Sequence, residues 1–275
     1  LLSMSMKEAF PDTSEAVYVA TSGGIDSSAL VMALLDTELQ PVVTSFTLDT
    51  HDSYDFLAAQ RLAQTFSLQF IPIYVPTDKE FICNSVMRNM YTYGLRKKAD
   101  VECMYPFLYM IKKLSEIGAR QLVSGMWADG HFCLSKTGMM HSRHSKEAFQ
   151  KFQRDYFYGK EKRQRTILPY ACLKHNIRFN APFWSDKVFD LFSDASWDDL
   201  NKPRQKEAIR KEFPELDILQ LKNHLNLQLG DSGIAEIVGE TVRTKYTPNK
   251  RSPVSAYNLL ARSRPIQGKV TYATK

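Results

Sequence analysis

The sequence predicts an α/β protein with a doubly wound, mostly parallel sheet in its first half and a helical C-terminal half. Two observations support this class. Short apolar, β-rich runs alternate with helical patterns up to about residue 130, which is typical of a parallel sheet with helices on both faces. Beyond that point the patterns are helical. The 275 residues, 44% of them hydrophobic, can bury a sizeable core, so a mainly disordered chain is excluded.

The predicted elements of the first half follow one another as strand, helix, strand. The first strand, AVYVAT, leads through the tight loop SGGIDSS into the helical run ALVMALL. Gly118 is expected to end the last helix of this half. We expect strands at residues 16–21, 41–46, 68–75 and 120–125, and helices at 29–35, 53–66 and 103–118.

The second half is predicted to be helical. Helices are expected at residues 145–159, 168–176, 185–195, 202–213 and 216–229. The last 35 residues contain scattered Pro and Gly and no acidic side chain, which favours an extended or partner-dependent tail. The pattern predicts three parts: an α/β core over 1–135, a helical region over 136–240 and a basic tail over 241–275.

Basic charge is concentrated in two segments. Residues 136–178 carry 11 basic and 3 acidic side chains, and residues 241–275 carry 8 basic and no acidic ones, within a net charge of +6. Tyr156, Phe157 and Tyr158 lie in the first segment. Basic charge with interleaved rings suits contact with nucleic-acid phosphates and bases. Solvated helix faces have the same composition, so nucleic acid is one candidate partner of both segments.

Composition also bears on the cellular location. No run approaches the roughly 18 apolar residues of a membrane span, and the N-terminal residues lack a basic region followed by an apolar run. We therefore expect a cytoplasmic protein without membrane insertion.

The four cysteines, which are Cys83, Cys103, Cys133 and Cys172, have no C-x-x-C pair or short ligand spacing. This spacing predicts reduced thiols rather than a zinc site or a disulfide framework.

SGGIDSS is the strongest local motif. Gly23 and Gly24 have no Cβ, so the backbone can turn sharply and bring its N–H groups close to an anion. The following helix adds the partial positive charge of its N-terminus. Asp26 suits a Mg²⁺ ion that bridges to phosphate oxygens. The hydroxyl donors of the loop are Ser22, Ser27 and Ser28. The motif predicts a pyrophosphate site, and the plainer alternative is a capped glycine turn.

SGGIDSS resembles the pyrophosphate loop (PP-loop) of the N-type ATP pyrophosphatases, which split ATP between the α- and β-phosphates and pass AMP to an acceptor. Over roughly residues 14–234 the chain is similar to the synthetase domain of asparagine synthetases and β-lactam synthetases. Four further stretches carry the resemblance, and they are YDFLAAQRLAQTF, SGMWADG, NAPFWSD and KPRQKEAIR. It implies an adenine nucleotide alpha hydrolase-like fold with ATP and Mg²⁺ as cofactors.

The resemblance also implies site residues outside the loop. SGMWADG is similar to the family's SG-x-G-x-DE, so Ser124 and Gly125 would lie against the nucleotide. Asp129 would complete a Mg²⁺ site with Asp26; the alternative is a helix cap or a solvated loop acid. Two more ATP-binding residues are expected at the end of the second strand and just beyond it, Phe46 and Leu48.

Two lysines compete for the catalytic position. Lys222 precedes NLQLGDSGI, which resembles the mobile loop whose lysine neutralises charge on the transferring phosphate and the leaving pyrophosphate. Lys206 lies in KPRQKEAIR, which is similar to the family's P-x-K-x-x-LR stretch. Either lysine has a plain alternative as a solvated helix charge.

The chain departs from the family on the acceptor side. Gly130 replaces the family's glutamate, Trp127 replaces a glycine, and Asn180 replaces an arginine. PFWSD has one residue more than the family's PFLD. These departures make aspartate a doubtful substrate. The candidate replacement acids or bases are His131, Asp155 and Glu147.

The nitrogen donor is a separate question. The family's glutamine-hydrolysing domain needs an N-terminal cysteine nucleophile, whereas the first cysteine here is Cys83. We expect free ammonia, another amine, or ammonia from a separate amidotransferase partner.

The leading hypothesis is an adenylating ligase of the asparagine-synthetase type. It would convert a small-molecule carboxylate to an acyl-adenylate and let ammonia or an amine displace AMP, forming an amide. One alternative is a PP-loop enzyme that adenylates a base of tRNA or DNA. Another is an ATP-binding homologue that has lost the acceptor half, as Gly130 suggests.

Overall fold

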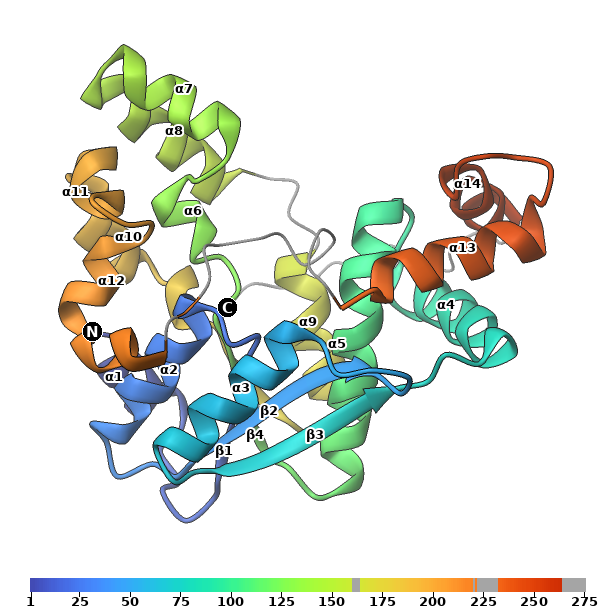
Figure 1. Ribbon diagram of the computed structural model, residues 1–275, viewed down its shortest axis with the longest axis horizontal. Coiled ribbons are helices and arrows are strands. Elements are labelled where there is room, and N and C mark those ends of the chain that lie inside the picture. The colour runs from blue at the N-terminus through green and yellow to red at the C-terminus, as the bar shows by residue number, and fades with distance from the viewer. Residues whose placement is uncertain (160–163, 220, 222–231, 264–275) are drawn as a thin grey trace.

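The computed structural model describes residues 1–159, 164–219, 221 and 232–263. At its centre lies a parallel sheet of five strands in the order β3-β2-β1-β4-β5 (Figure 1). The strands are β1 (Val17–Ala20), β2 (Pro41–Leu48), β3 (Gln69–Val75), β4 (Gln121–Ser124) and β5 (Arg178–Asn180). The chain runs outward from β1 to β3 and then returns to β4 on the other side of β1. This reversal is the switch point at which ligands of such sheets bind, and the predicted fold class is confirmed.

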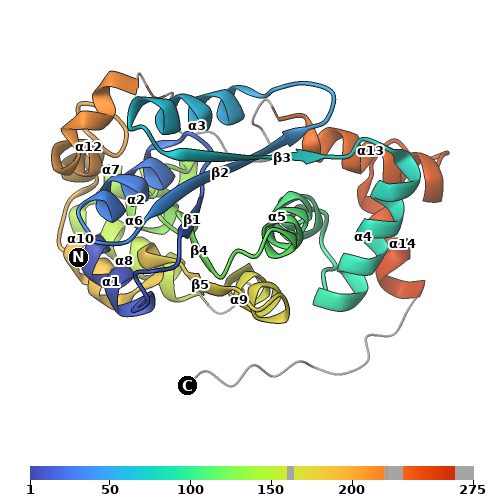
Figure 2. The ribbon, with the colours of Figure 1, turned by 90° about the horizontal axis from the view of Figure 1, so that it is seen from below.

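Helices cover both faces of the sheet. Figure 2 shows α2 (Ile25–Leu35) and α3 (Tyr54–Thr65) on one side and α5 (Lys98–Glu116) and α9 (Gln164–Lys174) on the other. The side chains of β1 alternate accordingly. Val17 and Val19 pack into the core on the α2 side, whereas Ala20 packs into the core on the α5 side. Both faces of β1 are therefore buried, as in other parallel sheets.

Local sequence explains where these elements begin and end. α2 is apolar almost all round and is buried along nearly its whole length, so packing rather than amphipathicity holds it. α3 begins at Ser53, whose side chain accepts a hydrogen bond from the Phe56 N–H. Pro72 lies in β3, an edge strand, where a missing N–H is tolerated. The helix α4 (Lys79–Tyr93) is ended by Gly94, which has a left-handed backbone.

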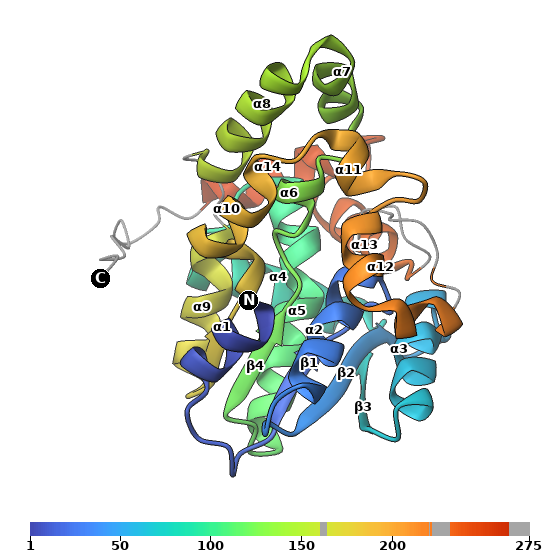
Figure 3. The same ribbon diagram turned by 90° about the vertical axis from the view of Figure 1, so that its left-hand side faces the viewer.

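The second half builds a helical superstructure on this core. α6 (Asp129–Phe132) leads into a hairpin of α7 (Lys136–His144) and α8 (Lys146–Tyr158), which projects beyond the carboxyl ends of the strands (Figure 3). The other elements are α1 (Leu2–Ala9), α4 (Lys79–Tyr93), η1 (Pro182–Trp184), α10 (Asp186–Ser193), α11 (Trp197–Asn201), α12 (Glu207–Glu212), η2 (Pro214–Leu219), α13 (Ile234–Tyr246) and α14 (Val254–Ser263).

Two sequence expectations for the second half are wrong. Strands do not end near residue 130, because β5 pairs with β4 over Arg178–Asn180; three residues are too few for a periodic signal. The expected extended tail instead contains the end of α13 (up to Tyr246) and α14 (Val254–Ser263), which pack Val242, Ala256 and Tyr257 into the core. The count of Pro, Gly and charge obscured these apolar positions. Residues 264–275 lie outside the described part of the chain.

A third expectation is tested only in part. Pro214–Leu219 forms the short 3-10 helix η2, and most of the helix expected at 216–229 lies outside the described residues.

The four cysteines are free thiols, as expected, and burial raises the pKa of Cys172 to about 12. Within the described ranges, no helix combines the length and apolarity that crossing a membrane requires. The division at residues 135 and 240 stays a prediction.

Candidate active site

The SGGIDSS segment, residues 22–28, joins β1 to α2 and is held tightly against α3. It is called the PP-loop below. Gly23 has a φ of 65°, in the left-handed region that favours glycine. A Cβ atom at Gly23 would lie 2.3 Å from the Cβ of Ala58 and 2.9 Å from the backbone N of Ala59. The two small alanines therefore let the loop approach the helix, and only glycine fits there. Gly24 is the N-cap residue of α2, so the free N–H groups of the helix start lie at the loop.

The hydroxyl groups of the loop are ordered around this turn. The Ser27 Oγ donates to the Gly24 carbonyl at 3.1 Å and accepts from the Ser22 N–H at 3.3 Å. The Ser22 Oγ accepts from the Gly24 N–H at 3.3 Å. Ser28 is fully buried, and its hydroxyl has no hydrogen-bond partner among the described residues. A buried hydroxyl without a protein partner is a donor available to a ligand.

A second loop, after β4, meets the start of α2. A Cβ atom at Gly125 would lie 3.1 Å from the Ser27 backbone N and 3.3 Å from the Asp26 Cβ. Ser124 is buried, and its Oγ accepts a hydrogen bond from the Met126 N–H at 3.3 Å. The structure thus brings Gly125, the residue after Ser124, against the first turn of α2 at the switch point of the sheet.

Trp127 interrupts this second loop with an unusual backbone. Its φ is 73°, a conformation that glycine adopts readily and that a bulky residue rarely does. The related family pattern SG-x-G-x-DE has a glycine at the position of Trp127. The structure supplies the physical reason, because the turn requires a residue with a left-handed backbone here. Trp127 keeps that turn, and α6 begins two residues later at Asp129.

Lys206 joins the two loops. Its side chain is only 1% exposed, and its Nζ forms ion pairs with an Asp26 carboxylate oxygen and, at 2.8 Å, with the Asp129 Oδ1. Asp26 is 18% exposed and Asp129 43% exposed. Two carboxylates from separate loops therefore converge on one buried cation. Of the two lysines considered from sequence, Lys206 lies in this cluster, and Lys222 lies outside the described residues.

The charge of Lys206 depends on its two partners. Burial by itself lowers the pKa of the Lys206 ammonium, because a charged group loses its hydration. The negative charges of Asp26 and Asp129, with their hydrogen bonds, outweigh this effect and raise the pKa. The two carboxylates thus favour the charged form of the ammonium.

Asn201 positions Lys206, and the sequence contained no signal for it. The Asn201 Oδ1 accepts from the Lys206 backbone N–H at 3.2 Å. The Asn201 Nδ2 donates to the Phe132 carbonyl at 3.0 Å and to the Trp197 carbonyl at 3.1 Å. This buried amide ties the left-handed backbone of Lys206, with a φ of 58°, to α6 and α11. An asparagine without a motif around it is not recognisable in advance.

Two other candidates from the sequence lie toward the carboxyl end of β2. Phe46 packs edge-on against Phe107 of α5, with ring centroids 5.3 Å apart, and Leu48 is buried in the core on the α5 side. Their role as nucleotide contacts stays a prediction.

Of the suggested replacement acids and bases, His131 lies in α6, and Glu147 and the exposed Asp155 lie in α8. His131 is fully buried, its Nε2 lies 2.6 Å from the Phe183 carbonyl, and rings such as Phe157 surround it. Glu147 is in the first turn of α8, where its own backbone N–H and Ser145 lower the pKa of the exposed carboxyl. His131 is accordingly a core residue and Glu147 a helix-start residue.

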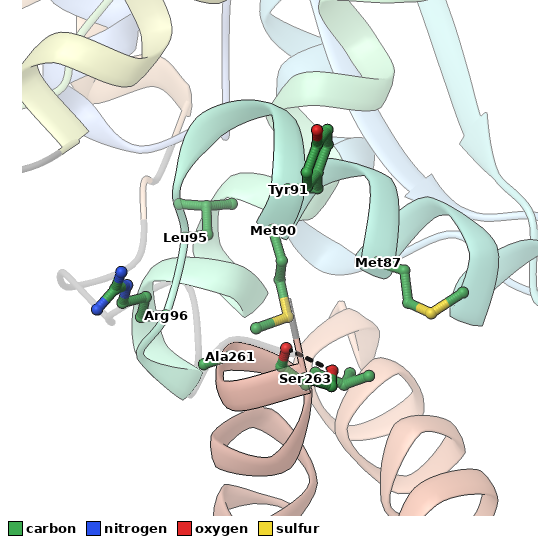
Figure 4. Close-up of a pocket in the computed structure, with 8 residues that line it drawn as sticks. Met87, Met90, Tyr91, Leu95, Arg96, Ala261 and Ser263 are labelled. Atoms are coloured by element: carbon green, nitrogen blue, oxygen red, sulfur yellow. Dashed lines mark hydrogen bonds between the residues drawn. The ribbon is translucent and has the colours of Figure 1, made fainter. Parts of the chain in front are cut away.

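A small pocket lies apart from this site. It is formed between α4 and the end of α14, and Figure 4 shows Met90 pointing toward that end while Arg96 points away. Its lining is Met87, Met90, Tyr91, Leu95, Arg96, Leu260, Ala261 and Ser263. This mostly apolar lining suits helix packing better than a phosphate. The group with the chemistry for a nucleotide is therefore the one at the ends of β1 and β4.

Comparisons with known proteins identify a family that the sequence matches and two solved structures with a weak likeness to this chain. A sequence model of the family described as asparagine synthase matches residues 2–229, a range that contains the whole Lys206 cluster. A structure described as a predicted subunit of tRNA methyltransferase from Methanocaldococcus jannaschii is 15% identical with a TM-score of 0.38, and the match covers 73% of this chain and 87% of that one. The U34-tRNA thiolase NcsA from Methanococcus maripaludis, with its 4Fe-4S cluster, is 12% identical with a TM-score of 0.43, covering 100% and 84%. No curated protein matches significantly.

Proposed function

This chain belongs to the asparagine synthase family, whose members use ATP through a PP-loop, and we propose that it splits ATP between the α- and β-phosphates. Pyrophosphate is released, and AMP is transferred to an oxygen atom of an acceptor. The observation that carries this proposal is the convergence of Asp26, Asp129 and Lys206 beside the PP-loop. Anion donors, carboxylates and a buried cation are the groups that the pyrophosphate half of the reaction needs.

The PP-loop is proposed to hold the β- and γ-phosphates. The N-terminus of α2 offers backbone N–H groups and a partial positive charge. The Ser28 hydroxyl, buried without a partner among the described residues, can donate to a phosphate oxygen. Ser27 keeps Ser22 and Gly24 in place through its two hydrogen bonds, so the donors are aligned before ATP arrives.

Asp26 and Asp129 fit a Mg²⁺ ion. Their carboxylate oxygens already meet at one cationic atom, the Lys206 Nζ. Carboxylates are the protein ligands that Mg²⁺ prefers, and this ion commonly takes one or two of them together with substrate phosphates. A bound Mg²⁺ would offset the negative charge of the phosphate oxygens. Asp129 is the more exposed of the two acids, so it is the more accessible ligand.

Lys206 is proposed to stabilise charge in the transition state. As the bond to pyrophosphate breaks, negative charge grows on the leaving oxygens, and a fixed ammonium in a dry site stabilises that charge strongly. Asn201 and the two carboxylates hold the ammonium in place. Lys222 remains a second candidate for the same role.

The acceptor half completes the reaction. A carboxylate oxygen of the acceptor attacks the α-phosphorus, and the bond from that phosphorus to pyrophosphate breaks. Ammonia or an amine then attacks the activated carbon, loses a proton and expels AMP, which carries away the acceptor oxygen. The product is an amide. The same steps work on a carbonyl oxygen of a nucleobase, with an amidine as the product.

Pyrophosphate release tests the proposal. Purified protein with ATP and Mg²⁺ is incubated with ammonium and, in turn, with amino acids, small carboxylates, nucleosides and oligonucleotides. AMP and pyrophosphate in equal amounts with one acceptor support the proposal. Formation of ADP instead would show cleavage at the wrong phosphate and contradict it, as would unchanged ATP with every acceptor.

A variant of the metal ligand supplies the control. Asp26→Asn should abolish adenylation and leave the folded state intact, because the amide keeps the size of the carboxylate but loses its charge. The matched variant is Asp36→Asn, which alters an exposed residue at the other end of α2 and should keep full activity. Full activity in Asp26→Asn would remove the metal assignment.

A further inference from the structure

We propose that the acceptor is a base of a single-stranded nucleic acid, which stacks on a pair of tryptophans beside Asp129 while the α7–α8 hairpin holds the neighbouring phosphates. This inference rests on the proposed adenylation and names its acceptor class. Three observations carry it: the Trp127–Trp184 contact, the ring that covers Gly130, and the charge of the hairpin.

The tryptophan pair lies at the edge of the site. The ring centroids of Trp127 and Trp184 are 5.1 Å apart with an interplanar angle of 43°. Trp127 comes from the loop after β4 and Trp184 from η1, and both side chains are partly exposed. Trp127 keeps an unfavourable left-handed backbone. A bulky residue that is strained and partly exposed near reactive groups indicates a function beyond core packing.

A third ring continues this aromatic surface on α6. A Cβ atom at Gly130 would lie 3.4 Å from the Tyr156 Cδ1, so the Tyr156 ring covers the helix face next to Asp129. Tyr156 is 41% exposed. The end of α8 also adjoins the tryptophan pair, because the Tyr158 hydroxyl donates to the Asp186 Oδ1 at 3.0 Å, two residues after Trp184. The acceptor side of Asp129 is thus bordered by rings, whose faces suit a flat aromatic group.

The α7–α8 hairpin adds positive charge next to these rings. It stands on α6 and projects past the carboxyl ends of the strands (Figures 1 and 3). Its acidic residues are Glu147 and Asp155. Its exposed basic residues are Lys136, Arg143, Lys146, Lys151 and Arg154. An excess of exposed lysine and arginine matches a phosphodiester backbone, and the stacked rings of His141 and Phe152, 4.8 Å apart, stiffen the hairpin.

These features favour a nucleobase over a small carboxylate. A free carboxylate is recognised by cations and N–H donors close to the reacting atom, whereas the groups that border Asp129 on this side are aromatic rings. A base offers a flat face for the rings and a carbonyl oxygen for adenylation. The strand that carries the base offers phosphates for the hairpin, which a small molecule does not need.

Binding of labelled oligonucleotides tests the surface directly. Fluorescence anisotropy with single-stranded RNA and DNA of about 12 nucleotides should show an affinity that falls steeply with salt, by about 0.7 in log affinity per log salt for each phosphate contact. Lys151→Gln with Arg154→Gln should reduce that slope by about 1.4. Lys112→Gln, which changes an exposed lysine on α5, is the matched control and should leave the slope unchanged.

Tryptophan variants test stacking. Trp127→Gly suits the left-handed backbone and removes the ring, and Trp184→Leu removes its partner; each should weaken binding by about tenfold. Trp197→Phe is the control, because the Trp197 indole N–H donates to the Cys133 carbonyl at 3.4 Å and the ring packs against the core on the α2 side. Quenching of tryptophan fluorescence by the oligonucleotide should disappear in the first two variants and persist in the third.

The outcomes separate the acceptor from the adenylation. Pyrophosphate release that requires an oligonucleotide and an amine supports both. Pyrophosphate release with a small carboxylate, without oligonucleotide binding, overturns the nucleic-acid acceptor and leaves the proposed function standing. Oligonucleotide binding without ATP cleavage overturns the proposed function and, with it, the role of the base as acceptor, and leaves only the nucleic-acid-binding surface standing. If a free nucleoside stimulates pyrophosphate release as strongly as an oligonucleotide does, and salt does not reduce the stimulation, the proposed binding of phosphates by the hairpin is overturned.

Discussion

Two buried ionic clusters of this molecule have opposite designs. In the active-site cluster the cation is buried: Lys206 is 1% exposed, and its partners Asp26 and Asp129 reach solvent. In the second cluster the acid is buried: Glu102 of α5 is completely covered, its partner Lys98 is 39% exposed, and their charged atoms lie 2.9 Å apart. The Tyr257 hydroxyl of α14 donates to the Glu102 Oε1 at 3.3 Å.

The pKa directions show what each arrangement achieves. Burial lowers the pKa of Lys206, but the two carboxylates outweigh it and the net pKa is raised. Burial raises the pKa of Glu102, and the hydrogen bonds from Lys98 and Tyr257 only partly offset that. The first cluster therefore keeps its charges and leaves its acids open to a ligand. The second closes around a poorly solvated acid and links α5 to α14, which is a structural role.

Loss of the buried cation should have the largest effect. In Lys206→Met the rate of pyrophosphate release is expected to fall by about 100- to 1,000-fold, because a charge-stabilising group is removed from a dry site. The fold should persist, since the two remaining carboxylates reach water. Steady-state kinetics and circular dichroism measure both. Lys211→Met, at an exposed position on the same helix, should keep full activity, and a similar rate in both variants would contradict the assignment.

The loop beside this cluster should be nearly as sensitive. Gly23→Ala places a Cβ 2.3 Å from the Ala58 Cβ at a left-handed position, so the free energy of unfolding should fall by roughly 2–4 kcal/mol. Gly118→Ala is a matched control, because its φ is 83° but no atom lies within 4 Å. Backbone strain alone should cost it about 1 kcal/mol. Equal losses in urea unfolding would show that contact with α3 does not constrain the PP-loop.

At the structural cluster, removing the cation should cost less. Lys98→Met leaves the Glu102 carboxylate buried with only Tyr257 as a partner. Because the Lys98 side chain is 39% exposed and water screens much of the pair, the free energy of unfolding should fall by only about 1 kcal/mol at pH 7. The loss should shrink at pH 5, since a protonated Glu102 needs no cation. Lys113→Met breaks an exposed pair with Glu116. It should change the free energy of unfolding by only a few tenths of a kcal/mol at either pH. An unchanged loss at pH 5 would contradict a buried ionised acid.

Removing the buried acid should have the smallest effect. Glu102→Gln is expected to alter the free energy of unfolding by less than about 1 kcal/mol at pH 7, because the lost ion pair is offset by the lost cost of burying a charge. In the native chain the raised pKa of Glu102 means that the folded state binds its proton more tightly than the unfolded state, so stability declines as pH rises above 4.5 toward the raised value. The variant should lack this decline in urea unfolding between pH 5 and pH 7. If the free energy of unfolding of Glu102→Gln declines as much as that of the native chain, another titratable group causes the decline.

The sequence was informative wherever a signal was contiguous. Strand, PP-loop and helix follow one another directly, so their order and chemistry could be predicted from spacing alone, and β1, α2 and α3 lie within a few residues of the expected bounds. Short or weakly patterned elements were missed. β5 has three residues, and α13 and α14 were hidden in a segment that composition described as a tail.

Tertiary structure decided the parts that depend on distant residues. Lys206 lies 180 positions after Asp26 and 77 after Asp129, and only the folded chain shows that this lysine reaches both acids. The pairing of Trp127 with Trp184 follows in the same way, since each looked like an isolated departure from a motif. Motifs report local backbone geometry and chemical type, whereas the partners of a side chain depend on how sheet and helices pack in three dimensions.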